Sequence, residues 1–217
     1  MLRALFKSSA KQIALHIEGT DEEFDRIYPR NIRRISEQHF TPLNVAKTAA
    51  SFLVSRPATR VLDIGSGAGK FCFVGAASTK GVFAGIEQRE DLVNLSNSIA
   101  RKLHIQNVRF IHTNVMGIAL KEFDAFYLFN PFYENVKAGE RIDDTVLVSP
   151  SLFASYSSYT RSQLSEMPEG TRLATYYTSP SFIPNDYRQV ESSSDGHLLL
   201  WEKCLFNQKT RESQMAP

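Results

Sequence analysis

The sequence has little cysteine: among its 217 residues only Cys72 and Cys204 occur, and they do not form a Cys-x-x-Cys pair. A disulfide framework or a structural zinc site needs more cysteines at closer spacing, so neither class of protein fits. Both cysteines lie in apolar stretches, and we expect them to be buried packing residues in a reducing compartment. We predict no metal site.

An excess of one charge is also missing, because 25 Lys and Arg face 23 Asp and Glu and leave a net charge of +2. This balance creates no general field that attracts a polyanion, so a nucleic-acid partner would need a local basic patch. Arg30, Arg33 and Arg34 form a tight cluster near the start of the chain. A solvated helix face accounts for such a cluster.

Long hydrophobic runs are the third absence, since no segment approaches the roughly 20 apolar residues that cross a bilayer. The start, MLRALFKSSAKQIALHIEG, has basic residues but no uninterrupted apolar stretch of signal-peptide length. We therefore expect a cytoplasmic protein that does not associate with membranes. Its length favours one domain with one substantial core.

What the sequence does contain, from Arg60 onward, is an alternation of short apolar runs with helical stretches. This alternation is typical of repeated strand-helix-strand units in an α/β fold with a parallel sheet. The runs are nearly apolar throughout, as expected of strands buried on both faces. A tight turn at Asp195-Gly196 joins the last two runs into an antiparallel hairpin. The predicted strands are 60–64, 81–87, 108–115, 123–130, 171–179, 187–194 and 197–204.

The segment before these strands is predicted to be helical. Residues 22–38 have the spacing of an amphipathic helix interrupted by Pro29, and we interpret them as an N-terminal lid or buttress. A second helix is predicted to begin with Thr41 as N-cap and Pro42 in the first turn, and to end near Ser55.

Two later helices and the outline of the domain follow from the same kind of pattern. Apolar residues stripe 92–103, and the Ser149-Pro150 pair is typical of a helix start. We expect a helical extension at 1–40, the main domain at 41–206 and a frayed tail at 207–217.

The strongest local signal is VLDIGSGAGK, in which Gly65, Gly67 and Gly69 follow a predicted strand and open a helix. Glycines at such a turn let the backbone bend sharply and let a ligand approach the main chain without obstruction by a Cβ atom. A dinucleotide-binding loop would have its third glycine at position 70, where this chain has Lys70. A nicotinamide- or flavin-dependent dehydrogenase is therefore a weaker alternative.

The spacing Gly-x-Gly-x-Gly, with Asp63 two residues ahead, resembles motif I of the class I S-adenosylmethionine-dependent methyltransferases, and the likeness extends over about residues 38–204. The resemblance implies S-adenosylmethionine as the cofactor. It implies a Rossmann-like sheet in the order 3-2-1-4-5-7-6 with strand 7 antiparallel, the cofactor across strands one and two, and substrate beyond strand four. The implied cofactor-binding residues around the loop are Asp63, Gly65, Ser66, Gly67 and Gly69.

Two other strand ends carry candidate cofactor ligands. Glu87, followed by Gln88, closes the second strand, where a carboxylate can accept hydrogen bonds from both ribose hydroxyls. Asn114 closes the third strand, where its carbonyl can accept from the adenine amine while Val115 donates through its backbone. A surface acid and an ordinary loop asparagine are the alternatives at these positions.

The fourth strand ends in FNPFYEN, where Asn130, Pro131, Phe132 and Tyr133 resemble the Asn-Pro-Pro-Tyr motif of amine-directed methyltransferases, among them DNA adenine, RNA adenine and protein glutamine types. An Asn carbonyl together with a backbone carbonyl can accept the N–H bonds of the target, and an aromatic ring can stack on a planar substrate. Phe132 stands where the motif has its second proline. A plain strand-ending turn is the alternative.

A partial likeness lies upstream in EQHFTPLNV, which resembles a Phe-Thr-Pro segment that caps the methionine end of the cofactor in some adenine methyltransferases. It implies that Phe40 and Thr41 touch the cofactor. Downstream, residues 133–144 are expected to form the acceptor-side rim. The expected rim side chains are Glu134, Arg141, Asp143 and Asp144, with Tyr156 and Tyr159 facing the rim or packing in the core.

These features together predict an S-adenosylmethionine-dependent methyltransferase that acts on a nitrogen acceptor. The low net charge and the lack of an inserted target-recognition region favour a small-molecule acceptor over nucleic acid or protein. The alternatives are an oxygen acceptor, a protein lysine, and a binding module that keeps the cofactor pocket without catalysis.

Overall fold

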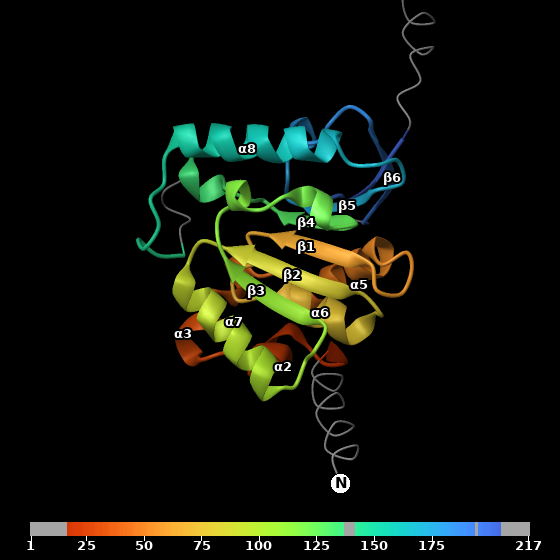
Figure 1. Cartoon of the computed structure of the whole chain (residues 1–217). Helices are drawn as coiled ribbons and strands as arrows, with labels where there is room; N and C mark the ends of the chain where they lie inside the picture. The colour runs from red at the N-terminus through yellow and green to blue at the C-terminus, as the bar shows by residue number, and fades with distance from the viewer. Residues whose placement is uncertain (1–16, 137–141, 194, 205–217) are drawn as a thin grey trace, which may run out of the picture.

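The fold is built on one seven-stranded sheet in the order β3-β2-β1-β4-β5-β7-β6 (Figure 1). The computed structural model describes residues 17–136, 142–193 and 195–204. The first five strands pair in parallel, and β7 runs antiparallel to both β5 and β6. The Rossmann-like α/β fold predicted from the sequence is confirmed. The strands are β1 (Arg60–Ile64), β2 (Val82–Glu87), β3 (Val108–His112), β4 (Ala125–Phe129), β5 (Arg172–Tyr176), β6 (Tyr187–Ser192) and β7 (Leu198–Lys203).

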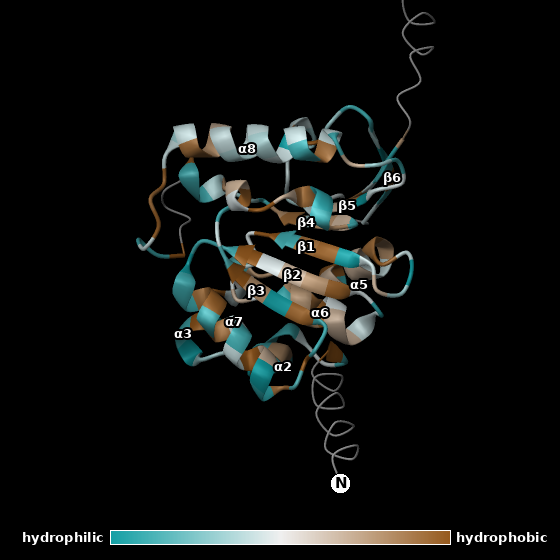
Figure 2. Cartoon of the chain, in the orientation of Figure 1, coloured by the Kyte–Doolittle hydropathy of each residue, from teal (hydrophilic) through white to brown (hydrophobic). Residues whose placement is uncertain are grey.

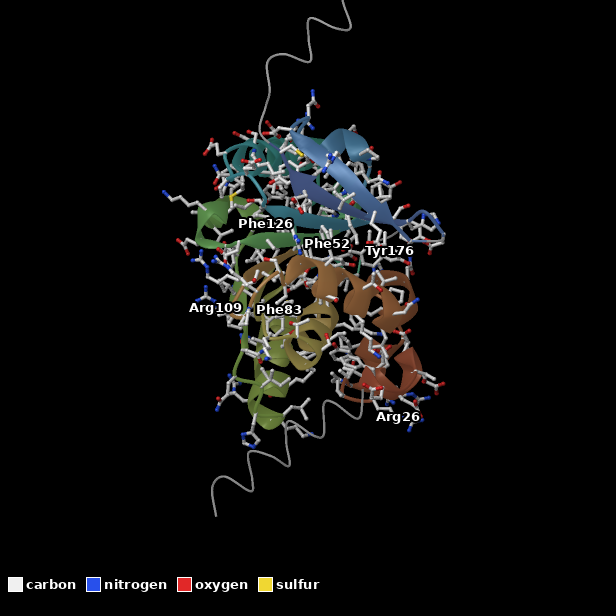
Figure 3. All side chains as sticks on the ribbon, turned by 90° about the vertical axis from the view of Figure 1, so that its right-hand side faces the viewer. Arg26, Phe52, Phe83, Arg109, Phe126 and Tyr176 are labelled. Atoms are coloured by element: carbon white, nitrogen blue, oxygen red, sulfur yellow. The ribbon has the colours of Figure 1, made fainter. Side chains whose placement is uncertain are left out.

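Helices cover both faces of this sheet, so the strands β1, β2, β4, β5 and β7 bury side chains on two sides, whereas the edge strand β6 is mostly exposed (Figure 1). Phe83 of β2 packs in the cluster shared with α5, α6 and α7, whereas Phe126 of β4 packs in the cluster shared with α8. Both rings lie in the interior in Figure 3, and Figure 2 shows brown, hydrophobic stretches along β1, β2, β3 and β4. Successive strand residues point to opposite faces, which explains the nearly continuous apolar runs. The helices are α5 (Leu43–Leu53), α6 (Lys70–Ser78), α7 (Glu90–Lys102) and α8 (Pro150–Ser165).

The N-terminal segment forms three short helices: α2 (Asp21–Asp25), α3 (Arg30–Arg33) and α4 (Ser36–His39). Phe24 and Tyr28 from this segment are buried in the same hydrophobic cluster as α5 and α6. The segment is therefore packed on the main core. Arg30, Arg33 and Arg34 are exposed, as is Arg26, which lies at the periphery in Figure 3.

The predicted boundaries of the main domain, after residues 40 and 206, stay a prediction. The expected tail at 207–217 lies outside the described residues, as does the rim residue Arg141.

The predicted N-cap of the second helix is wrong. Helix α5 begins at Leu43, with Pro42 as its N-cap residue. The Leu43 N–H donates to Oδ1 of Asp21 at 3.0 Å, so a carboxylate from α2 accepts the bond that we assigned to Thr41. The Thr41 hydroxyl is buried and lies 2.9 Å from the hydroxyl of Tyr127 on β4, which gives it a partner in the core.

Other observed boundaries also differ from the predicted ones because of local hydrogen bonds. Strand β3 ends at His112, and Asn114 caps a 3-10 turn at Val115–Gly117. Ser149 caps α8 as predicted, since its hydroxyl accepts from the Leu152 N–H at 3.2 Å. Cys72 is buried, but Cys204 is partly exposed, so the expectation of burial is wrong for the second cysteine.

Candidate functional site

The glycine loop joins β1 to α6 and turns sharply at the carboxyl end of the sheet. Gly65, Gly67 and Gly69 have φ angles of 81°, 52° and 82°, a region that favours glycine. A Cβ atom at Gly69 would lie 2.4 Å from the ring of Phe110, so this position also needs glycine for space. The N–H groups of Gly65 and Ser66 bond the Ile86 carbonyl and fix the loop against β2.

A cleft opens beside this loop, and most of the predicted site residues meet in its wall. We call it the strand-end cleft because the carboxyl ends of β1, β2, β3 and β4 supply its residues. The predicted residues that line it are Gly65, Gly67, Glu87, Gln88, Asn114, Val115, Asn130, Pro131, Phe132 and Tyr133. The other residues that we predicted to bind the cofactor, Phe40, Thr41, Asp63, Ser66 and Gly69, do not line it.

Glu87 is the most constrained polar group of the cleft. Its Oε2 accepts the Gly67 N–H at 3.1 Å, and its Oε1 accepts the N–H groups of Gln88 and Arg89 at 2.8 and 2.9 Å. These bonds hold the carboxylate of a side chain that is only 6% exposed. A carboxylate oxygen accepts more than one hydrogen bond, so Oε2 keeps capacity for a ligand hydroxyl.

Asn114 and Gln88 also have partners within the protein. Oδ1 of Asn114 accepts the Met116 N–H at 2.9 Å, so the carbonyl proposed for adenine serves a local turn. Oε1 of Gln88 accepts from the hydroxyl of Tyr156 at 3.3 Å, and that tyrosine is buried. The Tyr159 hydroxyl donates to the Ile118 carbonyl. Both tyrosines are therefore engaged in packing and in hydrogen bonds around the cleft.

Arg89 is a charged residue of the cleft wall that the sequence did not reveal. Its side chain is 6% exposed, and its Nε and Nη2 donate to Asp143 at 2.9 Å and to Glu134 at 2.5 Å. Nη1 lies 3.6 Å from Oε1 of Glu87. Burial lowers the pKa of the Arg89 guanidinium, but the adjoining carboxylates outweigh this effect and raise the pKa above its ordinary value. The group therefore stays charged.

Asp63 lies beneath the glycine loop, where it is 3% exposed and accepts a weak bond from Sγ of Cys72 at 3.6 Å. Burial, aided by the charge of Glu87, raises the pKa of Asp63 to about 8. The pKa of the Cys72 thiol is also raised by burial. The position of Asp63 fits a buried support of the loop.

The Asn-Pro-Phe-Tyr segment follows β4 in a strained backbone. Asn130 and Phe132 have φ angles of 39° and 67°, which non-glycine residues seldom adopt. The Asn130 N–H donates to the Tyr176 carbonyl and to Oγ1 of Thr178, each at 3.0 Å. The Phe132 ring packs 5.3 Å from that of Tyr156. Strain of this kind is typical of functional sites.

An aromatic pocket adjoins the cleft and shares five lining residues with it: Gln38, Phe129, Asn130, Pro131 and Tyr133. None of its lining side chains is charged. Tyr177 is half-exposed and stacks on His197 with ring centroids 4.1 Å apart. The pocket is lined by Gln38, Phe40, Pro42, Phe129, Asn130, Pro131, Tyr133, Phe153, Tyr176, Tyr177, Thr178, Ser179 and Phe182.

Within the described ranges, no group of three or more His, Cys, Asp or Glu side chains could hold a metal ion. No helix in the part of the chain that the structure describes has the length and apolar character needed to cross a bilayer.

The sheet order, the glycine loop and the strand-end cleft define the class I, S-adenosylmethionine-dependent methyltransferases. The chain belongs to the methyltransferase domain family, whose model matches residues 55–178. No curated protein matches the chain in sequence.

Solved structures share the fold at low sequence identity. TrmN from Thermus thermophilus superposes with a TM-score of 0.57 and 19% identity, covering 80% of this chain and 52% of TrmN. The chain thus spans about half the length of TrmN. The putative methyltransferase yhhF from Escherichia coli gives a TM-score of 0.53 and 13% identity, with 74% and 84% of the two chains covered. A SAM-dependent O-methyltransferase from Thermotoga maritima gives 0.51 and 16%, with 83% and 73% covered.

Proposed function

We propose that the chain transfers the methyl group of S-adenosylmethionine to a nitrogen atom of a small, uncharged acceptor. The observation that carries this proposal is the junction at Asn130, where the strand-end cleft meets the aromatic pocket. A methyl donor bound in the strand-end cleft and an acceptor bound in the aromatic pocket would approach each other at this residue. Close approach is the main requirement of methyl transfer.

The residues of the cleft fit the cofactor. Gly65 and Gly67 leave room along the main chain, and Oε2 of Glu87 faces the same cleft as a candidate ribose acceptor. Asn114 and Val115 stand where the adenine would lie. When bound, the sulfonium of the cofactor supplies the electrophilic methyl group. We assign Phe40 to the acceptor side, since it lines the aromatic pocket.

The aromatic pocket favours a neutral, planar acceptor. A protein ammonium would lose its hydration there and would find no carboxylate among the lining side chains. Oδ1 of Asn130 and a nearby backbone carbonyl would accept the N–H bonds of the acceptor and hold its lone pair toward the methyl group. Tyr133, with Phe132 behind it, would wall the acceptor and exclude water.

The experiment measures transfer of radiolabel from S-adenosylmethionine into small-molecule, protein and nucleic-acid fractions of a cell lysate. We expect label in small molecules, and removal of the Asn130 amide by Asn130→Ala should lower turnover about 100-fold while S-adenosylhomocysteine still binds. Asn130→Gly is the control for backbone strain. Glycine adopts the positive φ of this position without strain, and like alanine it lacks the side-chain amide.

The outcomes separate the alternatives. Unchanged turnover in Asn130→Ala would remove this residue from the mechanism. Label on protein or nucleic acid would overturn the small-molecule acceptor. Cofactor binding with no transfer to any fraction would identify a binding module instead.

A further inference from the structure

One guanidinium joins three carboxylates from three separate segments beside the strand-end cleft. Arg89 follows the end of β2, and Glu134 lies in the 3-10 turn after Asn130. Asp143 belongs to residues 142–149, which we call the acceptor-side segment. Glu87, the candidate ribose ligand, is the third acid. The group therefore connects the cofactor edge of the cleft to its acceptor edge.

We propose that Arg89 is a positioning residue that couples cofactor binding at Glu87 to the placement of Glu134 and of the acceptor-side segment, which carries Asp143. This inference rests on the proposed function, because it takes Glu87 as the residue that the cofactor contacts.

The bonding pattern supports a coupling role. Each carboxylate meets a different nitrogen of the guanidinium: Nη1 faces Glu87, Nη2 donates to Glu134 and Nε donates to Asp143. The guanidinium is a rigid planar fork, so it cannot shift toward one acid without changing its geometry to the other two. A displacement at the ribose side is thus transmitted to the acceptor side.

The charges support the same conclusion. Three carboxylates and one guanidinium leave a local excess of negative charge, and like charges at short range repel each other. Glu134 and Asp143 are 24% and 39% exposed, so solvent alone could satisfy them. The carboxylates of Glu134 and Asp143 are held near that of Glu87 because the guanidinium of Arg89 pairs with all three. Without Arg89, repulsion would move the acceptor-side segment away from the cofactor edge.

A second feature of this segment makes its position important. Leu147 lines the strand-end cleft although it is 82% exposed, and Ile142, Val146 and Val148 of the same segment also line the cleft. Asp143 bonds both the backbone N–H and the hydroxyl of Thr145, which fixes the start of this apolar stretch. Holding Asp143 therefore sets how closely an apolar wall stands over the cleft.

The test uses S-adenosylhomocysteine as the probe and hydrogen exchange of residues 142–149 as the readout. In the wild type, the probe should slow exchange of this segment. Arg89→Gln should abolish the slowing and weaken binding of the probe about tenfold. Arg89→Lys keeps the charge but loses the fork, so it should restore only part of both effects. Arg60→Gln is the matched control, because Arg60 pairs with Asp124 on the surface outside the cleft.

Asp143→Asn provides a second test in case Arg89→Gln does not fold. It removes one of the three charges at a partly exposed position, so it should bind the probe within about threefold of the wild type yet lose the slowing at 142–149. If the probe slowed hydrogen exchange at residues 142–149 of Asp143→Asn as much as in the wild type, the coupling would be wrong. The coupling would also be wrong if the wild type bound the probe without any change in the hydrogen exchange of these residues. A wild type that does not bind the probe would instead refute the proposed function.

Discussion

At the scale of the residue, Asp63 is the group whose titration has the clearest consequence. Its pKa of about 8, raised mainly by burial, contrasts with an ordinary value of 3.8. Between these two pH values the unfolded chain has released the Asp63 proton while the folded protein still holds it. The free energy of unfolding of the cofactor-free protein should therefore fall as pH rises from about 4 to about 8, by about 1 kcal/mol per pH unit from this residue.

Asp63→Asn tests this prediction, because the amide has nearly the same shape and does not titrate. Urea unfolding at pH 5.5, 7 and 8.5 should give a flatter pH dependence for the variant than for the wild type. Asp124→Asn is the control: the pKa of that carboxyl is lowered by Arg60, so Asp124 titrates below this range. Parallel curves for Asp63→Asn and the wild type would show that Asp63 is ionised in the folded protein.

Single residues also show where the sequence stopped being informative about the site. Glu87 was found because a strand end limits which side chains can meet a ligand there. The partners of Arg89 are 45 and 54 residues away, and no local pattern predicts such pairs. Thr41 was misread for a related reason, since its competing partner, Tyr127, is 86 residues away.

At the scale of the element, the sequence predicted the strands well because their apolar runs reflect burial on both faces. Strand β1 has the predicted bounds, and β2 differs by one residue. The ends were less predictable, as at β3, where a side-chain cap at Asn114 competes with the strand. The packing of α2 on α6 was not predicted, because it depends on ion pairs between distant elements.

The ion pairs of Lys70 with Asp21 and Asp25 lead to a prediction about how α2 is held on α6. Lys70 is 3% exposed, and its Nζ lies 2.6 Å from Asp21 and 2.8 Å from Asp25, which is itself buried. Lys70→Met should lower the free energy of unfolding by about 3 kcal/mol, because it leaves the buried charge of Asp25 without a counter-ion and with only the Ser36 hydroxyl as a hydrogen-bond donor. Asp21→Asn should cost less than about 1 kcal/mol, because Asp21 is 49% exposed.

Urea denaturation measures both variants, with Lys80→Met as a control at an exposed lysine in the connection from α6 to β2. If Lys70→Met were no less stable than Lys80→Met, α2 would be held by Phe24 and Tyr28 alone. The double variant Lys70→Met/Asp25→Asn should recover part of the loss, since it removes the uncompensated charge.

At the scale of the whole molecule, binding in the strand-end cleft should raise the unfolding temperature. The cleft draws residues from β1, β2, β3 and β4, so a ligand that holds them together binds only the folded chain. At a concentration of 100 times its Kd, such a ligand adds about 2.7 kcal/mol of stability. For a chain of 217 residues, this corresponds to an increase in Tm on the order of 5 to 10 °C.

S-adenosylhomocysteine should produce this increase, whereas NAD at the same concentration should not, because Lys70 stands where a dinucleotide loop needs its third glycine. Glu87→Gln should reduce the increase, since the amide loses the charge that strengthens a ribose hydrogen bond. Glu90→Gln, an exposed neighbour on α7, should leave it unchanged. A rise in Tm with NAD alone would show that the cleft binds a dinucleotide and would contradict S-adenosylmethionine as the cofactor. An equal rise in both variants would mean that the cleft recognises its ligand without the carboxylate of Glu87. The ribose side of the site would then have to be sought among other residues of the cleft wall.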